Sequence, residues 1–293
     1  MTSSLSFRCT ARKTVLAWIL ATLPFRCVAM TSSVNITSGS WPPYLEDTPS
    51  HGIIGQIIDE AFAEEGMAVR WGFFPWARSF RLAQKGIWDG SAAWACTPER
   101  APDFYFSDAI IPVRLAFFYR RSDPIDWTTI DDLKGLRIGL SRDYHYGDTI
   151  NQAIANGTLE SEIARSDDIN FRKLLAGRID LFPIDVAVGR RLLARSFTQD
   201  EIARLAVHPR VVYATQLRLM LSRHVAGNEA RLQQFNKGLQ ALRLRGRIDA
   251  IMAHAASELP YPVTLYGDEP DPAECNFAQA PESDVPAPGT GAQ

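Results

Sequence analysis

The sequence predicts an α/β fold. Short apolar runs alternate with segments of helical periodicity along most of the chain, which favours a sheet flanked by helices over an all-β fold. Three stretches, "KGIWDG" (85–90), "AGRIDL" (176–181) and "RGRIDA" (245–250), place glycine, an apolar residue and aspartate at the end of a helix, and a strand follows the first two. Their irregular spacing indicates helix-to-strand corners in two similar lobes, not a solenoid.

The first half of the chain supplies a first series of strands and helices. These are strand 34–38, helix 53–66, strand 68–74, helix 77–86 and strand 90–95. The helix over 53–66 has apolar residues at helical spacing, and Gly66 closes it.

A second series starts near residue 128. It comprises a short helix over 130–135 capped by Thr128 or Thr129, strand 136–140, helix 146–157, a helix-to-strand segment over 171–184, and helices over 186–196 and 198–206. The chain then returns through strand 212–223 into one long amphipathic helix over 228–255. Crossings near residues 120 and 213 would form a hinge between the lobes.

Residues 1–29 have the layout of a secretory signal peptide. The segment before Thr14 carries three basic residues and no acid, the apolar stretch "TVLAWILATLPF" follows, and Ala29 can sit before a cleavage point. The apolar core is too short for a permanent membrane span. A short buried or amphipathic helix is the less favoured alternative, and the residues before Cys27 suit lipid-anchor processing poorly. We expect a soluble protein exported to the periplasm.

The charge balance argues against a nucleic-acid partner. Removing residues 1–29 takes away four of the 31 Lys and Arg residues and none of the 33 Asp and Glu residues, which leaves a formal charge of −6. Polyanions are bound by clustered excess Lys and Arg. We expect a small-molecule solute as the ligand and a monomer as the oligomeric state.

Two cysteines, Cys96 and Cys275, remain after the signal peptide is removed. Cys275 lies in a tail rich in proline, glycine and acids, and residues 266–293 lack the apolar content to fold. A Cys96–Cys275 disulfide can form in an oxidising compartment, but no framework spacing supports it. The favoured interpretation of Cys96 is a small buried residue.

Candidate ligand contacts follow three predicted strands, because open parallel sheets bind ligands beyond the carboxyl ends of their strands. Arg100 in "CTPER" suits a ligand carboxylate, since its guanidinium makes two parallel charge-assisted hydrogen bonds. Asp185 in "PIDVAVG" can receive an ammonium across the cleft. Trp41 and Tyr44 in "SWPPYLE" can form an apolar or cation–π wall, and Trp76 can form another.

Each of these residues has a structural alternative. An isolated Arg–Asp pair is more often structural than ligand-binding, and Trp76 is more often a core residue. The favoured interpretation of Tyr144 and His145 is a turn. Asp167 and Asp168 are interpreted as the solvated cap of a helix and not as a catalytic pair. The sequence contains no GxSxG, HExxH, P-loop or CxxC motif, so we expect no metal, no cofactor and no catalysis.

The chain resembles the bacterial extracellular solute-binding proteins of family 3. The resemblance covers about residues 33–260 and rests on six segments in order: "SWPPYLE" with "GIIGQIIDEAF", "KGIWDG", "TPERAPDFYFS", "DDLKGLRIGL", "LLAGRIDLFPID" and "FNKGLQALRLRGRIDAI". It implies the two-lobed type II periplasmic fold, with mostly parallel sheets flanked by helices and two crossing hinge strands. Lobe 1 would hold residues 30–120 and 213–265, and lobe 2 residues 121–212.

The same resemblance assigns roles to individual residues. In the family's T-x-x-R motif the arginine binds the ligand α-carboxylate, which places Thr97 and Arg100 at the ligand. The acid five residues after Asp180 binds the α-amino group, which is Asp185, and the aromatic before the first turn, Trp41, lines the side-chain pocket.

Two departures from the family pattern touch expected ligand contacts. Ala95 stands where a hydroxyl residue is usual, and the turn containing Asp143 replaces one rich in Gly, Thr and Ser. The solute is therefore expected to be an amino acid, a modified amino acid, or another small zwitterion or carboxylate.

We expect a non-enzymatic binding protein that captures its solute by lobe closure for an ABC-type permease. One alternative is a sensor that delivers its ligand to a membrane receptor. The other is an enzyme resembling cyclohexadienyl dehydratase, for which Asp185 would be the general acid.

Overall fold

The computed structural model describes residues 32–142, 144–257 and Cys275, all within one compact unit of residues 31–293. The predicted signal peptide and, apart from Cys275, the predicted disordered tail lie outside the described residues. Within the described part of the chain, no helix is both long and apolar enough to cross a membrane.

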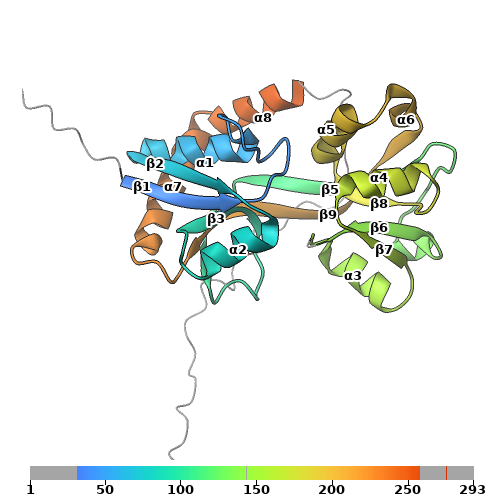
Figure 1. The fold of residues 1–293 in the computed structure, drawn as a ribbon, viewed down its shortest axis with the longest axis horizontal. Coiled ribbons are helices and arrows are strands. Elements are labelled where there is room, and N and C mark those ends of the chain that lie inside the picture. The colour runs from blue at the N-terminus through green and yellow to red at the C-terminus, as the bar shows by residue number, and fades with distance from the viewer. Residues whose placement is uncertain (1–31, 143, 258–274, 276–293) are drawn as a thin grey trace, which may run out of the picture. The chain divides into compact units, whose positions relative to one another are not determined.

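A mixed seven-stranded sheet runs through the fold, which confirms the α/β class (Figure 1). Its order is β2 (Met67–Phe73), β1 (Ser32–Ser38), β3 (Gly90–Ala95), β9 (Leu205–Ser222), β5 (Ile111–Arg120) and β8 (Phe182–Asp185), with β4 (Phe104–Phe106) beside β9. Strand β1 is parallel to β2 and β3, whereas β9 is antiparallel to β3 and β5. A second, parallel pair is formed by β6 (Arg137–Ser141) and β7 (Glu160–Ala164).

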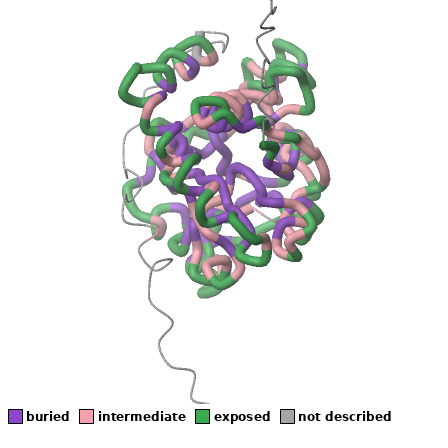
Figure 2. The backbone as a smooth tube through the Cα atoms, turned by 90° about the vertical axis from the view of Figure 1, so that its left-hand side faces the viewer, coloured by how far each residue is buried: buried purple, intermediate pink, exposed green. Residues whose placement is uncertain are grey.

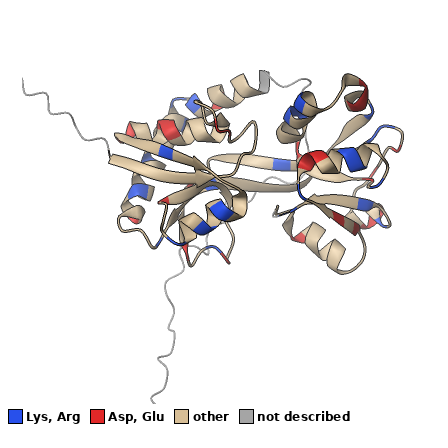
Figure 3. Cartoon of the chain, viewed as in Figure 1, with Lys and Arg blue, Asp and Glu red and all other residues tan. Residues whose placement is uncertain are grey.

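Helices pack on these strands through faces that the sequence periodicity marks. They are α1 (Gly52–Glu64), α2 (Trp76–Gln84), the 3₁₀ helix η1 (Ile130–Leu133), α3 (Gly147–Ala155), α4 (Asp167–Leu175), α5 (Val186–Ser196), α6 (Gln199–Ala203), α7 (Asn228–Leu244) and α8 (Arg247–Ser257). The apolar face of α1 is buried and packs on α7, where the rings of Phe62 and Phe235 lie 5.0 Å apart. The buried residues lie at the centre of the fold, as Figure 2 shows, and basic and acidic residues are interspersed over its elements (Figure 3).

Three elements differ from the predicted boundaries. Strand β7 was not predicted because four of its five residues are exposed and give no apolar pattern. Strand β9 begins at Leu205, inside the segment predicted as helix 198–206, because it pairs with β5 as far as Arg120. The predicted long helix over 228–255 is two helices, α7 and α8, because Gly246 adopts a left-handed conformation at φ 65° and ends the first.

The expectation for Cys96 was wrong in one respect. Cys96 is buried, as predicted, but it forms a disulfide with Cys275 across 179 residues of sequence. The sequence offered no sign of the pairing because Cys275 lies far along the chain, outside any folding pattern. The bond fixes one point of the C-terminal segment to the end of β3.

Candidate functional site

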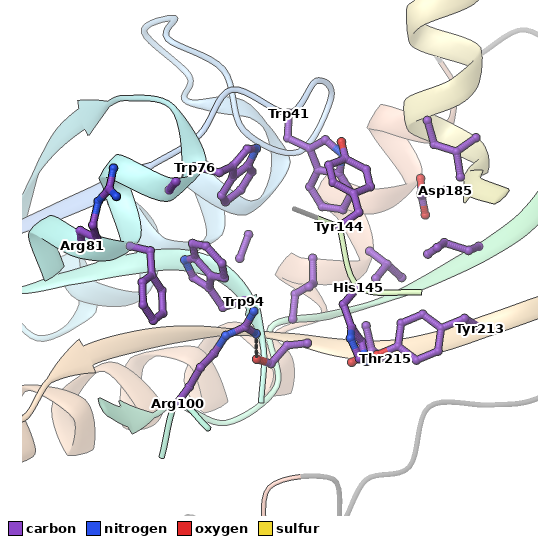
Figure 4. A pocket seen from close by; sticks show the side chains of 18 residues that line it. Trp41, Trp76, Arg81, Trp94, Arg100, Tyr144, His145, Asp185, Tyr213 and Thr215 are labelled. Atoms are coloured by element: carbon purple, nitrogen blue, oxygen red, sulfur yellow. Dashed lines mark hydrogen bonds between the residues drawn. The ribbon is translucent and has the colours of Figure 1, made fainter. Parts of the chain in front are cut away.

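A cavity of about 430 Å³ lies where the carboxyl ends of β1, β3, β6 and β8 meet the two long strands β5 and β9. Its walls are aromatic and aliphatic, and its polar groups are three charged side chains, His145, Thr215 and two tyrosine hydroxyls (Figure 4). The aromatic lining residues are Trp41, Trp76, Phe80, Trp94, Tyr144 and Tyr213.

Five of the eight predicted ligand-binding residues line this cavity: Trp41, Trp76, Ala95, Arg100 and Asp185. Tyr44 lies beside it, with its hydroxyl donating to Asp185 Oδ1 at 3.0 Å. Thr97 is not a lining residue, and its hydroxyl donates to the carboxylate of Glu99. Asp143 lies outside the described residues.

Arg100 follows β3 in a turn closed by a hydrogen bond from its own N–H to the carbonyl of Thr97, 3.1 Å away. Its Nη1 donates to the carbonyl of Ala95 at 2.6 Å, and the guanidinium lies 4.9 Å from the centre of the Trp94 ring. Burial lowers the pKa of Arg100. No carboxylate oxygen of the described residues lies within ion-pairing distance of this group, so most of its five N–H donors are available to a ligand.

A bulge in β3 brings Trp94 to the cavity. The pairing of β3 with β9 shifts by one residue between Ser91 and Trp94, and Ala93 within the shift has a φ of 65°. The left-handed region is unfavourable for a residue with a Cβ, so strain is stored at the cavity wall. The Trp94 indole is then fixed by a hydrogen bond from its Nε1 to Ser91 Oγ at 2.8 Å.

Asp185 occupies the opposite side of the cavity from Arg100 (Figure 4). It ends β8 and caps α5, since its Oδ1 accepts from the N–H groups of Ala187 at 2.9 Å and Val188 at 3.1 Å. The backbone N–H of Arg114 also donates to the carboxylate, as does Tyr44. Burial raises the pKa of Asp185 although each of these donors lowers it, and the residue is 6% exposed.

The loop after β1 positions Trp41 and Tyr44. A small hairpin joins Trp41 and Leu45 by two backbone hydrogen bonds of 2.7 and 3.0 Å, and the rings of Trp41 and Tyr44 lie 4.8 Å apart. Trp41 therefore lines the cavity while Tyr44 reaches past it to Asp185.

A buried polar cluster holds Tyr144 in the cavity wall. The Tyr144 hydroxyl donates to Asp167 Oδ2 at 3.0 Å, and Ser141 Oγ donates to the other oxygen of the same carboxylate. Burial raises the pKa of Asp167. Asp167 opens α4, as expected of a residue at a helix start, but its half-buried carboxylate accepts from two hydroxyl groups at the end of β6 instead of facing solvent alone.

Two aromatic walls rest directly on glycine backbone. A Cβ at Gly39 would collide with the Trp76 indole, and a Cβ at Gly147 would collide with the Tyr213 ring. Only glycine lets these rings approach so closely, and the contact restricts their movement. These two walls are therefore already in place before any ligand enters.

Over residues 32–142 and 144–257 with Cys275, no group of three or more His, Cys, Asp or Glu side chains is arranged to hold a metal ion.

Several lining residues were not singled out as ligand contacts from the sequence. Trp94 and Tyr213 reach the cavity through a bulge and a long-range strand pairing, neither of which leaves a local signal. Tyr144 and His145 were interpreted as a turn, but both line the cavity. The one available signal was their position directly after a predicted strand.

The chain matches the bacterial extracellular solute-binding proteins, family 3, over residues 34–256. It belongs to this family, and the family implies a periplasmic or extracellular location. No curated protein matches the chain.

Solved structures share the fold. A histidine kinase sensor domain described as similar to periplasmic binding proteins has a TM-score of 0.65 at 20% identity, covering 79% of this chain and 99% of that one. An ancestral arginine-binding protein bound to arginine has a TM-score of 0.62 at 18% identity, covering 77% and 98%. A mutant of ArgBP from T. maritima also has a TM-score of 0.62, at 17% identity, covering 78% and 96%. The fold is that of the type II periplasmic binding proteins.

Proposed function

We propose that this protein captures a small carboxylate-bearing solute in the aromatic cavity, with Arg100 binding the carboxylate. The observation that carries the proposal is the half-buried guanidinium of Arg100, which lines the cavity and, within the described part of the chain, has a single backbone carbonyl as its hydrogen-bond acceptor. Removing a cation from water without an anionic partner costs free energy, and a ligand carboxylate would offset that cost by making two charge-assisted hydrogen bonds with Arg100.

Capture would occur by closure of two lobes, residues 30–120 with 213–265 and residues 121–212. The pairing of β5 with β9 supports this, because these strands carry the chain between the two sets of residues. Lobe closure about a few strand positions would bury the solute. The closed form would then deliver the solute to an ABC-type permease, and the protein would act as a monomer in the periplasm.

A sensor role would use the same binding step with a membrane receptor as the partner, so the cavity itself does not separate sensing from transport. The similarity to a histidine kinase sensor domain keeps this alternative open.

An enzymatic role is less well supported. Its one favourable observation is that burial raises the pKa of Asp185 in the cavity. However, the four groups of the described residues that hydrogen-bond to that carboxylate are donors, which hold it as an acceptor and oppose its use as a proton donor.

Thermal shifts of the full chain against amino acids, amines and small carboxylates test the proposal, with Arg100→Ala measured alongside. A bound solute at a hundredfold excess over its Kd stabilises the folded state by about 2.7 kcal/mol. We expect shifts from carboxylates that disappear in Arg100→Ala and persist in Arg195→Ala, an exposed arginine that does not line the cavity. Shifts from amines alone, or carboxylate shifts that survive Arg100→Ala, would contradict it.

A further inference from the structure

Most of the acceptor capacity of the Asp185 carboxylate is taken by the protein. Four protein donors reach it, namely the Tyr44 hydroxyl and the backbone N–H groups of Arg114, Ala187 and Val188. A carboxylate offers about four lone-pair sites. Three of these donors converge on Oδ1, so an ammonium placed beside Asp185 would find acceptor capacity only on Oδ2, too little for its three N–H donors.

Two further carboxylates of the described residues near the cavity are also engaged. Glu99 accepts from its own backbone N–H and from the hydroxyl of Thr97, and Asp167 accepts from Tyr144 and Ser141. Among the described residues, the charged groups that line the cavity are two arginines, Arg81 and Arg100, and Asp185, which already accepts from four protein donors. This balance favours an anionic ligand over a zwitterion.

The aromatic walls favour a planar apolar body. Trp76 and Trp94 lie edge to face with their centres 5.3 Å apart, and both stand on the Arg100 side of the cavity (Figure 4). The face of Trp94 already carries the guanidinium of Arg100. A second cation there would be repelled by Arg100, whereas a ring would gain offset or edge-to-face contacts with fixed partners.

We propose that the solute is an aromatic carboxylate without an α-ammonium group, with its ring among the tryptophans and its carboxylate on Arg100. This inference rests on the proposed function and narrows its ligand class. It gives Asp185 the role of building the cavity wall and not of binding an amino group.

Calorimetric titration of the full chain with matched probes tests this ligand class. The probes are 3-phenylpropionate, L-phenylalanine, which adds only the ammonium, and propionate, which lacks the ring. We expect 3-phenylpropionate to bind at least about tenfold more tightly than L-phenylalanine, because the ammonium loses its hydration and gains fewer acceptors than its three N–H donors need. We expect a similar advantage of about tenfold or more over propionate, because the ring buries apolar surface.

A variant localises the ring. Trp76→Leu is expected to weaken 3-phenylpropionate about tenfold and leave propionate unchanged. Trp71→Leu is the matched control, since Trp71 donates to Asp59 and does not line the cavity.

Each other outcome overturns the inference. If L-phenylalanine binds as tightly as 3-phenylpropionate or more tightly, the cavity accepts an ammonium and the argument from Asp185 fails. If propionate binds as tightly as 3-phenylpropionate, the ring adds nothing and the argument from the tryptophans fails. In both cases the proposed function still holds if Arg100→Ala abolishes the binding. Binding of glycine betaine without binding of 3-phenylpropionate overturns the inference in favour of a cation site, and no binding of any carboxylate overturns both proposals.

Discussion

The two charged sides of the cavity are built in opposite ways. Arg100 has one protein acceptor, the carbonyl of Ala95, and no carboxylate partner among the described residues. Asp185 has four protein donors and caps a helix. The difference teaches that a charge in a cleft is not by itself a ligand contact, because what matters is how much of its hydrogen-bonding capacity the fold has left unused.

The largest expected effect on the free energy of unfolding concerns the disulfide bond next to the Arg100 side of the cavity. Cys275→Ser removes the disulfide to Cys96, which follows directly after Ala95. Because the bond closes a very long loop, the chain-entropy relation gives a loss in the free energy of unfolding of about 5 kcal/mol. Urea denaturation measures it, and wild-type protein under reducing conditions should match the variant. A change below about 1 kcal/mol would show that the bond does not stabilise the fold.

The next effect separates the two sides directly. Asp185→Ala leaves buried donors without an acceptor and removes the α5 cap, so we expect a loss of about 3 kcal/mol in the free energy of unfolding. Arg100→Ala loses one hydrogen bond and one ring contact, and the loss should be no more than about 1 kcal/mol. The comparison is contradicted if denaturant titrations show the same loss in the free energy of unfolding for the two substitutions.

The sequence predicted the fold much better than the cavity. The order of the strands and helices follows from local periodicity, and Arg100 could be placed because it directly follows a strand of small and aromatic residues. The state of Asp185 could not be predicted, since its donors come from residues as distant as Tyr44 and Arg114. The bulge that places Trp94 in the cavity wall could not be predicted either, and nor could the pairing of Cys96 with Cys275, because both depend on contacts between distant parts of the chain.

A smaller effect is expected at the hydroxyl that joins the first loop to Asp185. Tyr44→Phe removes one of the four donors and keeps the ring against Trp41, so the free energy of unfolding should fall by about 1 kcal/mol. Carboxylate binding should be unchanged, which thermal shifts with 3-phenylpropionate measure. Loss of binding in this variant would place the ligand closer to Asp185 than we propose.

The smallest expected effect is a pH dependence confined to the Asp185 side. The folded-state pKa of Asp185 is raised by burial above its unfolded value of about 3.9, so the folded state holds this proton more strongly. Its contribution to stability is complete below that unfolded value and is lost as the pH rises through the folded value. Asp185→Asn cannot titrate, so wild type should gain stability relative to this variant as the pH falls from 7 towards 4. Parallel unfolding curves for the two proteins over this range would contradict the assignment.

One measurement tests the central claim most directly: calorimetric titration of the same carboxylate, 3-phenylpropionate, into wild type, Arg100→Ala and Asp185→Asn. The account predicts that Arg100→Ala weakens binding about 100-fold, because a charge-assisted bidentate contact is lost. Asp185→Asn should change the Kd by less than about threefold, since that carboxylate already belongs to the protein. A loss in Asp185→Asn as large as that in Arg100→Ala would contradict the account, because Asp185 would then take part in binding the ligand.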